Sequence, residues 1–504
     1  MTTSSQPVRV RLAPSPTGYI HIGTLRTALF DFLFARKTGG KVILRVEDTD
    51  QNRFVEGAIE NMLKVFKEMG INFDEGYYLD ENNEIKEKGE YGPYLQSKRL
   101  NLYHQHVLEL IEKKKAYYCF CSEERLEEVR KEQVALKKPP MYDRHCRNLS
   151  AEEIKKQLEE FKEAGKTPIV RQAMPLQGQT TIHDIIYGDV VYENKLLDDQ
   201  VILKSDGFPT YHLAVVVDDH HMNISHVIRG EEWIPSTPKH ILMYEAFGWE
   251  KPQFAHLPLI LNPDKSKLSK RQGDVAVEDF LKKGYLKQAL LNFIAFLGWN
   301  PKTEQEIFTM DELIEQFDLS KVNRAGAVFD IAKLDWINGL YIRHMEVGEL
   351  ADALLPYWKE AGIDTEKFSH GYFTAIANLE KERLKKLSEI GERTAYFFKA
   401  PEYNGQLLVW KKSDAEDAKV KLTAMKNFFS ELSDADFKKT VLEEKLKAFI
   451  TQNNFDNGSV LWPLRVALTG MEKSPGPFEV ASTLHIGLGK QEVLNRIGTA
   501  IQKL

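Results

Sequence analysis

Two short stretches of this chain carry residue types that suit the binding of phosphate groups. The first runs from Arg11 to Thr24 and reads RLAPSPTGYIHIGT. Gly18 and Gly23 let the backbone approach a ligand closely, and His21 stands where an apolar helical pattern begins. Since a helix start presents N–H groups and the positive end of a dipole, the stretch predicts a phosphate-binding loop. Taken alone, a histidine that only caps the helix is an equally good interpretation.

The second stretch is a basic loop from Asp264 to Gly273, which reads DKSKLSKRQG. It places Lys267, Lys270 and Arg271 on a segment rich in turn-forming residues. Such a run is usually a solvated loop. It nevertheless strengthens the hypothesis of a nucleotide site, because it offers a second group of cations for the phosphates.

The elements around the first stretch position it at the end of a parallel sheet. Strands are predicted at 8–12 and 41–46, and the helix between them, at 24–38, ends at Gly39. A strand, a helix and a strand at this spacing form a right-handed unit whose loops at the carboxyl ends of the strands build the site. The acidic segment 47–50 follows the second strand directly, so we expect it beside the first stretch. An acidic first turn of a helix is the alternative.

Arg229 occupies an equivalent place after a later strand. That strand is predicted at 223–228, and the parallel arrangement again puts its carboxyl end on the side of the site. A guanidinium can hold a carboxylate through two parallel N–H bonds. A structural ion pair with Glu231 or Glu232 is the competing interpretation.

The rest of the chain alternates between strands and helices and then becomes mainly helical. Other elements are predicted before the basic loop: helices at 56–70, 100–115 and 237–248, and strands at 211–217 and 256–260. Beyond the loop, the main helices are predicted at 286–297, 311–317, 350–361 and 379–390. Asp218–His221 follows a predicted strand, where neighbouring side chains point to opposite faces, so a shared metal site is not favoured there.

All three cysteines of the chain lie in a segment, 116–204, whose pattern differs from its surroundings. This segment predicts an inserted α/β domain that interrupts the sheet. Cys119, Cys121 and Cys146 form a partial zinc pattern with His145 beside it, but tetrahedral zinc needs four ligands. Reduced thiols without a metal are therefore the favoured interpretation, with zinc as the alternative.

The composition excludes several classes of protein. At 504 residues, the length suggests three or more domains. No apolar run reaches the roughly 20 residues needed to span a bilayer, and the N-terminus lacks an apolar signal core, so a cytoplasmic location is expected. The formal net charge of −6 argues against a generally basic nucleic-acid binder but allows a locally basic RNA-binding face.

Together the two stretches resemble the signature motifs of class I aminoacyl-tRNA synthetases. HIGT at 21–24 is similar to their His-Ile-Gly-His motif, and KLSKR at 267–271 is similar to Lys-Met-Ser-Lys-Ser. The chain departs from these motifs at Thr24, Leu268 and Arg271. Longer strings, among them APSPTGYIHIGT, LFARKTGGKVILRVEDTD, LKSDGFPTYHLAVVVDDH and HVIRGEEWIPSTPKH, resemble the bacterial glutamyl-tRNA synthetases over nearly the whole chain.

The resemblance implies an α/β Rossmann-type parallel sheet with an inserted acceptor-binding domain, followed by a mainly α-helical C-terminal half. The implied division has five parts: a catalytic first half (1–115), an acceptor-end-binding insertion (116–204), a catalytic second half (205–260), a stem-contact connector with the lysine loop (261–346) and an anticodon-binding helical region (347–504). The implied reaction activates L-glutamate with ATP and Mg²⁺ and transfers it to tRNA(Glu), and activation waits for tRNA. No membrane and no obligate protein partner are implied.

The resemblance also implies residue roles. Three residues would assist catalysis: His21, Lys267 and Lys270. Eight would contact ATP: Thr17, Gly18, His21, Gly23, Thr24, Trp233, Ile260 and Lys270. Five would contact glutamate: Arg11, Ser15, Glu47, Tyr211 and Arg229. Among these, Arg11 and Arg229 would bind the side-chain carboxylate and Glu47 the ammonium group. Val215 stands where some members have an asparagine near the α-carboxylate. At Thr24, an N-cap hydroxyl or the backbone would contact phosphate.

Other functions remain alternatives at this point. A glutaminyl-tRNA synthetase would share the catalytic motifs but carries β-barrel anticodon domains, whereas the last third here reads as helical. The short relative that glutamylates a tRNA base lacks so long a C-terminal region. A non-catalytic RNA-binding relative would not need His21, Glu47, Arg229 and Lys270 together, and a small-molecule adenylating ligase would not need the long helical tail.

Overall fold

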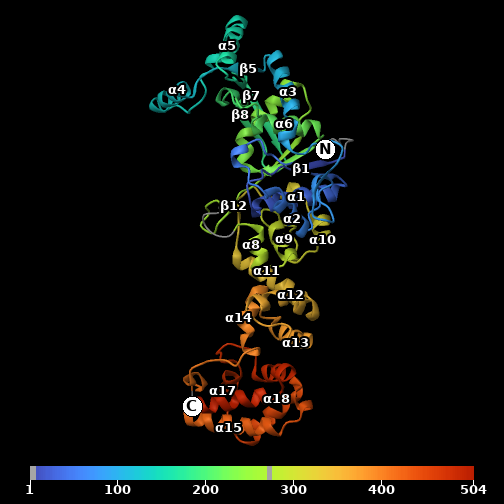
Figure 1. Cartoon of the computed structure of the whole chain (residues 1–504), viewed down its shortest axis with the longest axis vertical. Coiled ribbons are helices and arrows are strands. Elements are labelled where there is room, and N and C mark those ends of the chain that lie inside the picture. The colour runs from blue at the N-terminus through green and yellow to red at the C-terminus, as the bar shows by residue number, and fades with distance from the viewer. Residues whose placement is uncertain (1–6, 269–274, 412) are drawn as a thin grey trace. The chain divides into compact units, whose positions relative to one another are not determined.

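The computed structural model describes residues 7–268, 275–411 and 413–504, which form two compact units (Figure 1). The first unit comprises Met1–Phe280 and Leu290–Ile331. The second comprises Leu281–Ala289 and Ala332–Leu504.

Two sheets with parallel cores carry the first unit. The first sheet has the order β1 (Arg9–Leu12), β2 (Lys41–Leu44), β3 (Glu75–Leu79) and an antiparallel edge strand, β4 (Ile85–Lys88). The second has the order β10 (His226–Gly230), β11 (Gln253–Leu257), β7 (Gln179–Asp184) and an antiparallel edge strand, β8 (Gly188–Glu193). The sheets meet beside β1, where the Ser225 N–H donates to the Arg9 carbonyl over 2.9 Å. The predicted Rossmann-type parallel core is confirmed.

Helices connect these strands, and four of the five lie where the apolar spacing predicts a helix. They are α1 (Ile22–Thr38), α2 (Ala58–Glu68), α3 (Leu100–Glu112), α6 (Tyr211–His221) and α7 (Thr237–Phe247). α1 packs on β1, β2 and β10 and ends at Gly39, whose φ of 66° is the left-handed conformation that glycine adopts easily. α7 likewise ends at Gly248.

The segment 116–204 divides between two sheets. An antiparallel sheet is formed by β5 (Ala116–Cys119), β6 (Ile169–Gln172) and β9 (Val201–Leu203). Beside β5, the helices α4 (Glu123–Ala135) and α5 (Ala151–Glu163) stand out from the rest of the unit (Figure 1). β7 and β8 come from the same segment but extend the second sheet, so part of the predicted insertion belongs to a sheet with a parallel core.

The strand predicted at 211–217 is wrong, because these residues begin helix α6. The run Leu213–Val217 is apolar throughout and completely buried, and a short run of this kind fits a buried helix as well as a buried strand. The consequence is large for the two acids that follow. Asp218 and Asp219 lie on consecutive positions of one helix and both face buried arginines.

The remaining elements are mainly helical. Between residues 260 and 344 they are β12 (Ile260–Leu261), α8 (Val277–Lys282), α9 (Lys287–Ala295), α10 (Met310–Gln316), β13 (Ala327–Val328) and α11 (Ile331–His344). The second unit continues with α12 (Val347–Glu360), α13 (His370–Glu380), α14 (Ile390–Thr394), α15 (Ala415–Glu431), α16 (Lys439–Gln452), α17 (Asn457–Thr469) and α18 (Pro477–Lys503). No helix in the described ranges is long and apolar enough to span a bilayer.

The helix predicted at 379–390 is also wrong. α13 ends at Glu380, and a turn leads to the short helices Leu387–Glu389 and α14. Glu380 is 1% exposed and accepts hydrogen bonds from Arg383 and Arg393. The apolar residues of this stretch, such as Leu384, face the same core although the chain turns between them, so their spacing resembles a helix.

Candidate active site

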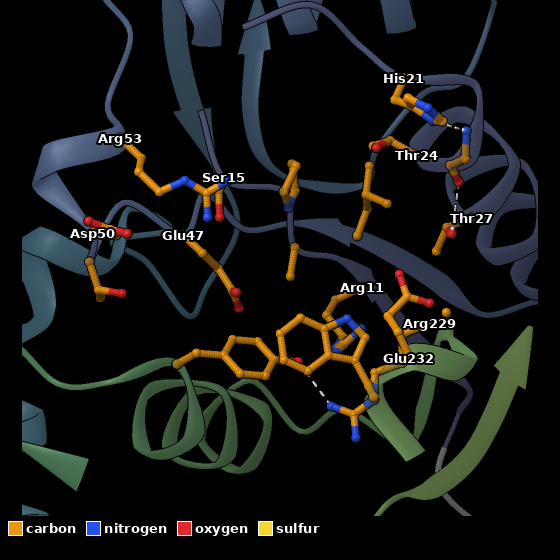
Figure 2. Close-up of a pocket in the computed structure, with 18 of the residues that line it drawn as sticks. Arg11, Ser15, His21, Thr24, Thr27, Glu47, Asp50, Arg53, Arg229 and Glu232 are labelled. Carbon is orange, nitrogen blue, oxygen red and sulfur yellow. Dashed lines mark hydrogen bonds between the residues drawn. The ribbon is translucent and has the colours of Figure 1, made fainter. Parts of the chain in front are cut away.

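A cavity of about 790 Å³ opens at the carboxyl ends of the parallel strands in the first unit. Figure 2 shows His21 and Thr24 at one end of it and Asp50 and Arg53 at the other. Arg11, from β1, and Glu47, from the loop after β2, line it together with Arg229 of β10. Glu47 and Arg229 thus lie on the same side of the parallel strands, as their positions at the ends of predicted strands indicate.

Most of the predicted site residues that the structure describes line this cavity. They are Arg11, Ser15, His21, Gly23, Thr24, Glu47, Tyr211, Arg229, Trp233, Ile260 and Lys267. Thr17 lines a smaller cavity that shares Ser15 and Glu47 with the first, and Gly18 lines neither. Val215 is buried in α6 and does not line the large cavity. Lys270 and Arg271 lie outside the described residues.

The first backbone N–H groups of α1 already have hydrogen-bond acceptors within the protein. His21 is the N-cap residue, and its Nδ1 accepts a hydrogen bond from the Gly23 N–H over 2.9 Å. The N–H groups of Ile22 and Thr24 donate to the carbonyls of Val275 and His21. The expectation that Thr24 provides an N-cap hydroxyl is wrong, because the cap is His21 and Thr24 lies inside the first turn.

A ladder of buried charges supports the floor of the cavity. Arg11 Nε lies 3.1 Å from Asp219 Oδ1, and the same oxygen lies 2.7 Å from Arg45 Nη1. Arg45 Nη2 lies 3.1 Å from Glu47 Oε1. Burial tends to lower the pKa of Arg11, but the Asp219 carboxylate raises it above its ordinary value. The ion pair with Asp219 thus holds Arg11 in place, and the ion pair with Arg45 holds Glu47 in place.

Glu47 is a buried carboxyl group whose pKa lies well above the ordinary value of a glutamate. It is 7% exposed, and burial raises its pKa to about 7, although Arg45 and Arg11 oppose this shift. A carboxyl poised in this range can exchange a proton when a cation binds beside it.

Arg229 is surrounded by neutral acceptors. Its guanidinium donates to Tyr211 Oη over 2.9 Å, to Thr237 Oγ1 over 2.7 Å and to His256 Nε2 over 3.2 Å. The competing interpretation, an ion pair with Glu231 or Glu232, is wrong within the part of the chain that the structure describes. Glu231 instead accepts from the Leu259 N–H over 2.8 Å.

One wall of the cavity is aromatic. The rings of Tyr211 and Trp233 lie 4.3 Å apart between centroids, and Ile260 also lines the cavity. Lys267 reaches the rim, where its Nζ lies 3.9 Å from Glu232 Oε1. An aromatic and apolar wall beside a rim cation suits a base and its phosphates.

Comparison with known proteins identifies the family of this chain. A model of the class I tRNA synthetases for E and Q, catalytic domain, matches residues 7–336, and an anticodon binding domain model matches residues 349–501. The glutamate–tRNA ligase of Alkaliphilus metalliredigens is 47% identical over 498 residues, which cover 98% of each chain. That of Clostridioides difficile is 46% identical over 503 residues, covering 97% of this chain and 98% of the other. The chain belongs to the glutamate–tRNA ligase family.

The structure agrees with this assignment. A crystal structure of a glutamate tRNA ligase from Elizabethkingia meningosepticum in complex with its amino acid superposes with a TM-score of 0.85, at 36% identity, over 99% of both chains. The predicted activity is therefore confirmed, and the glutaminyl and non-catalytic alternatives are not supported. The ligase is a class I aminoacyl-tRNA synthetase, for which ATP is a substrate.

The cavity of the ligase contains residues that the sequence did not single out. They are Arg26, Thr27, Asn52, Arg53, Lys204 and Asp206. Lys204 Nζ lies 3.2 Å from the Thr49 carbonyl, which brings the turn after β9 against the acidic loop. The composition of this turn does not reveal which loop it will meet, so the sequence does not indicate a role for Lys204.

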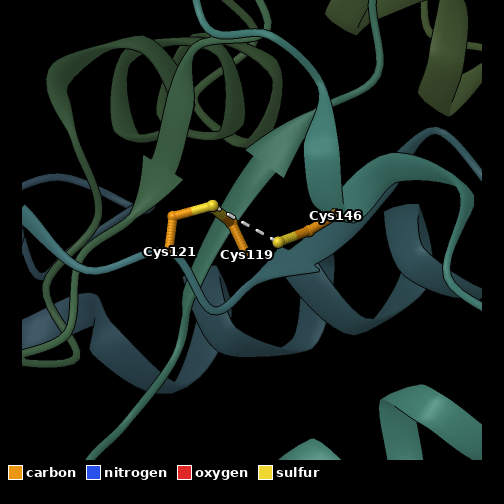
Figure 3. A group of neighbouring side chains, drawn as sticks. All are labelled: Cys119, Cys121 and Cys146. Atoms are coloured by element: carbon orange, nitrogen blue, oxygen red, sulfur yellow. Dashed lines mark hydrogen bonds between the residues drawn. The ribbon is translucent and has the colours of Figure 1, made fainter. Parts of the chain in front are cut away.

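The three cysteines of the ligase form one cluster in the insertion (Figure 3). Their Sγ atoms lie within 4.8 Å of one another, and Tyr142 Oη lies 3.4 Å from Cys119 Sγ and from Cys121 Sγ. Hydrogen bonds with Cys121 and Cys146 lower the pKa of the Cys119 thiol. The three thiols lie close enough together to share one zinc ion, and the Tyr142 phenol oxygen lies beside them. His145 is exposed and is not one of the grouped residues.

Proposed function

We propose that the cavity binds L-glutamate at its buried end and ATP toward the start of α1. Glu47 pairs with the substrate ammonium group, and Arg229, together with Arg11, binds the side-chain carboxylate. Ser15 and Tyr211 add hydrogen bonds along the wall. The observation that supports this proposal most directly is that the buried carboxylate of Glu47 and the buried guanidinium groups of Arg11 and Arg229 line the same cavity.

ATP occupies the remaining space in the proposal. The adenine lies between Trp233 and Ile260, and the phosphates approach His21, Gly23 and Thr24. Because the N–H groups at the start of α1 already have acceptors, cations must supply most of the phosphate contacts: Lys267, Lys270 and Mg²⁺.

The reaction then proceeds in two steps. An oxygen of the α-carboxylate of glutamate attacks the α-phosphorus, the bond to the bridging oxygen breaks, and pyrophosphate leaves. A hydroxyl of the terminal ribose of tRNA(Glu) next attacks the carbonyl carbon of the adenylate, loses its proton, and AMP leaves. In this proposal the segment 116–204 receives the acceptor end of the tRNA, 261–346 contacts its stem and 347–504 binds the anticodon.

The role of Arg229 gives the sharpest test of the proposed site. Arg229→Ala should raise the KM for glutamate by about 10²-fold, because it leaves a buried carboxylate without its cation, and change the KM for ATP far less. Pyrophosphate exchange in the presence of tRNA measures both constants. An equal loss for both substrates would make Arg229 a structural residue.

Charging of purified glutamate and glutamine tRNAs with labelled glutamate would establish the range of tRNA substrates.

The cysteine cluster is proposed to hold one structural zinc ion. Cys119, Cys121 and Cys146 provide thiolates and Tyr142 provides the fourth donor. Metal analysis of the purified ligase should give about one zinc per chain, and Cys121→Ser should lower both the zinc content and the melting temperature of the first unit. An intact ligase without bound metal would favour the reduced-thiol interpretation.

A further inference from the structure

Arg229 differs from Arg11, the other arginine of the proposed glutamate site, because no carboxylate in the described residues forms an ion pair with it. Arg11 and Arg45 both contact Asp219. Arg229 is 6% exposed, and in the part of the chain that the structure describes its guanidinium has neutral hydrogen-bond partners. They are Tyr211 Oη, Thr237 Oγ1, His240 Nδ1 and His256 Nε2. The positive charge of a guanidinium held in this way is not neutralised by the protein, so it is available to bind an anionic ligand.

His256 can accept a hydrogen bond from Arg229 only in one tautomer. Its Nε2 lies 3.2 Å from Arg229 Nε, which always carries a proton, so Nε2 must be the unprotonated nitrogen. The proton then lies on Nδ1, which is 2.6 Å from Asp184 Oδ2. The two side chains are 0% and 1% exposed. Asp184 therefore fixes the tautomer of His256.

Asp184 is itself fixed at the end of β7. Its Oδ1 accepts the N–H groups of Ile186 and Tyr187 over 2.9 and 2.8 Å, and its Oδ2 also accepts the His256 N–H over 3.1 Å. A carboxylate that already accepts four hydrogen bonds has no freedom to turn toward Arg229. The imidazole ring thus separates the negative charge of Asp184 from the guanidinium.

The second imidazole beside Arg229 is neutral as well. His240 Nδ1 lies 3.4 Å from Arg229 Nη1 and Nη2, and its Nε2 lies 3.0 Å from His212 Nδ1. Burial, followed by the charge of Arg229, lowers the pKa of His240 well below its ordinary value. Burial also lowers the pKa of His256. Both rings therefore act as acceptors and add no competing charge.

We infer that Asp184 and His256 are positioning residues that hold Arg229, without neutralising it, for the side-chain carboxylate of glutamate. This inference rests on the proposed role of Arg229. The arrangement favours a substrate with a charged side chain over one with a neutral amide, because only a carboxylate can neutralise the unpaired guanidinium.

Two substitutions at His256 separate this role from a merely structural one. The amide of asparagine can replace Nδ1 and keep the bond to Asp184, but it has no atom at the place of Nε2. The longer glutamine can put its carbonyl oxygen there and accept from Arg229. His256→Asn should therefore raise the KM for glutamate by about tenfold or more while the KM for ATP stays within about twofold, and His256→Gln should restore most of the loss.

The matched control is His183→Asn. His183 also lies on a strand of the second sheet and also pairs with an aspartate, Asp189, but both side chains are exposed. All variants are compared in pyrophosphate exchange with tRNA present, and their melting temperatures are measured. His183→Asn should change neither KM. A wild-type glutamate KM in His256→Asn, an equal defect in His256→Gln, or an equal rise in both KM values would each overturn the inference.

Arg229→Ala in the same assay distinguishes a failure of the proposed role of Arg229 from a failure of the positioning role of Asp184 and His256. If Arg229→Ala leaves the glutamate KM unchanged, the proposed role of Arg229 fails and the inference fails with it. If Arg229→Ala raises the glutamate KM and His256→Asn does not, only the positioning role of Asp184 and His256 is overturned.

Discussion

At the scale of single residues, the ionisation of Glu47 controls the proposed amino-acid site. Burial raises its pKa to about 7, so the carboxyl is largely protonated in mildly acidic solution. Only the ionised form can pair with the substrate ammonium. We expect kcat/KM for glutamate to rise about tenfold per pH unit below pH 7 and to level off above it, as pyrophosphate exchange at saturating ATP would measure.

A Glu47→Gln variant provides the control for this profile. It should have a low kcat/KM for glutamate, because the amide is neutral at every pH, and it should lose the rise below pH 7. If the variant keeps the same rise, the ionisation belongs to a different group, and Glu47 is not the partner of the ammonium.

The site could be predicted from sequence where strand ends determine it. Arg11, Glu47 and Arg229 lie at or just after the carboxyl ends of parallel strands, and such ends meet at one edge of a sheet. Asp184 and His256 could not be recognised in this way. Their roles depend on the pairing of β11 with β7, two strands far apart in the sequence, and no local pattern indicates that pairing.

At the scale of elements, α6 shows why a local pattern can mislead. Its buried apolar run has no periodicity, so length and flanking residues had to decide between helix and strand, and the strand was the wrong choice. Only a helix brings Asp218 and Asp219 together beneath the cavity. Asp218 accepts from Arg99 and Tyr103, whereas Asp219 accepts from Arg11 and Arg45.

Asp219 is therefore expected to be the acid of α6 that matters most for stability. Asp219→Asn removes the charge between two buried arginines, 3% and 0% exposed, and should lower the free energy of unfolding by about 3 to 5 kcal/mol. Urea unfolding followed by fluorescence measures this change. Asp189→Asn, which alters an exposed pair with His183, should cost less than about 1 kcal/mol. Equal effects of the two substitutions would contradict a structural role for the buried ladder.

At the scale of the whole molecule, the parallel core and the helical C-terminal region followed from sequence, but the path of the insertion did not. The parallel core, the cysteine-containing segment and the helical C-terminal half could be predicted because each has its own periodicity and composition. The return of β7 and β8 to the catalytic sheet could not be predicted, since an edge hairpin looks the same in sequence whichever sheet it joins.

The two compact units should unfold as separate cooperative transitions, because each contains its own large buried tryptophan and its own core. Trp299 belongs to the first unit and is 1% exposed. Trp358 belongs to the second, is 0% exposed and donates from Nε1 to Thr394 Oγ1 over 2.9 Å. Either substitution to alanine should cost about 3 to 5 kcal/mol and lower the melting temperature of its own unit by roughly 10 °C. In differential scanning calorimetry, Trp299→Ala should shift one transition and Trp358→Ala the other. A single transition that both variants shift equally would mean that the chain unfolds as one cooperative body.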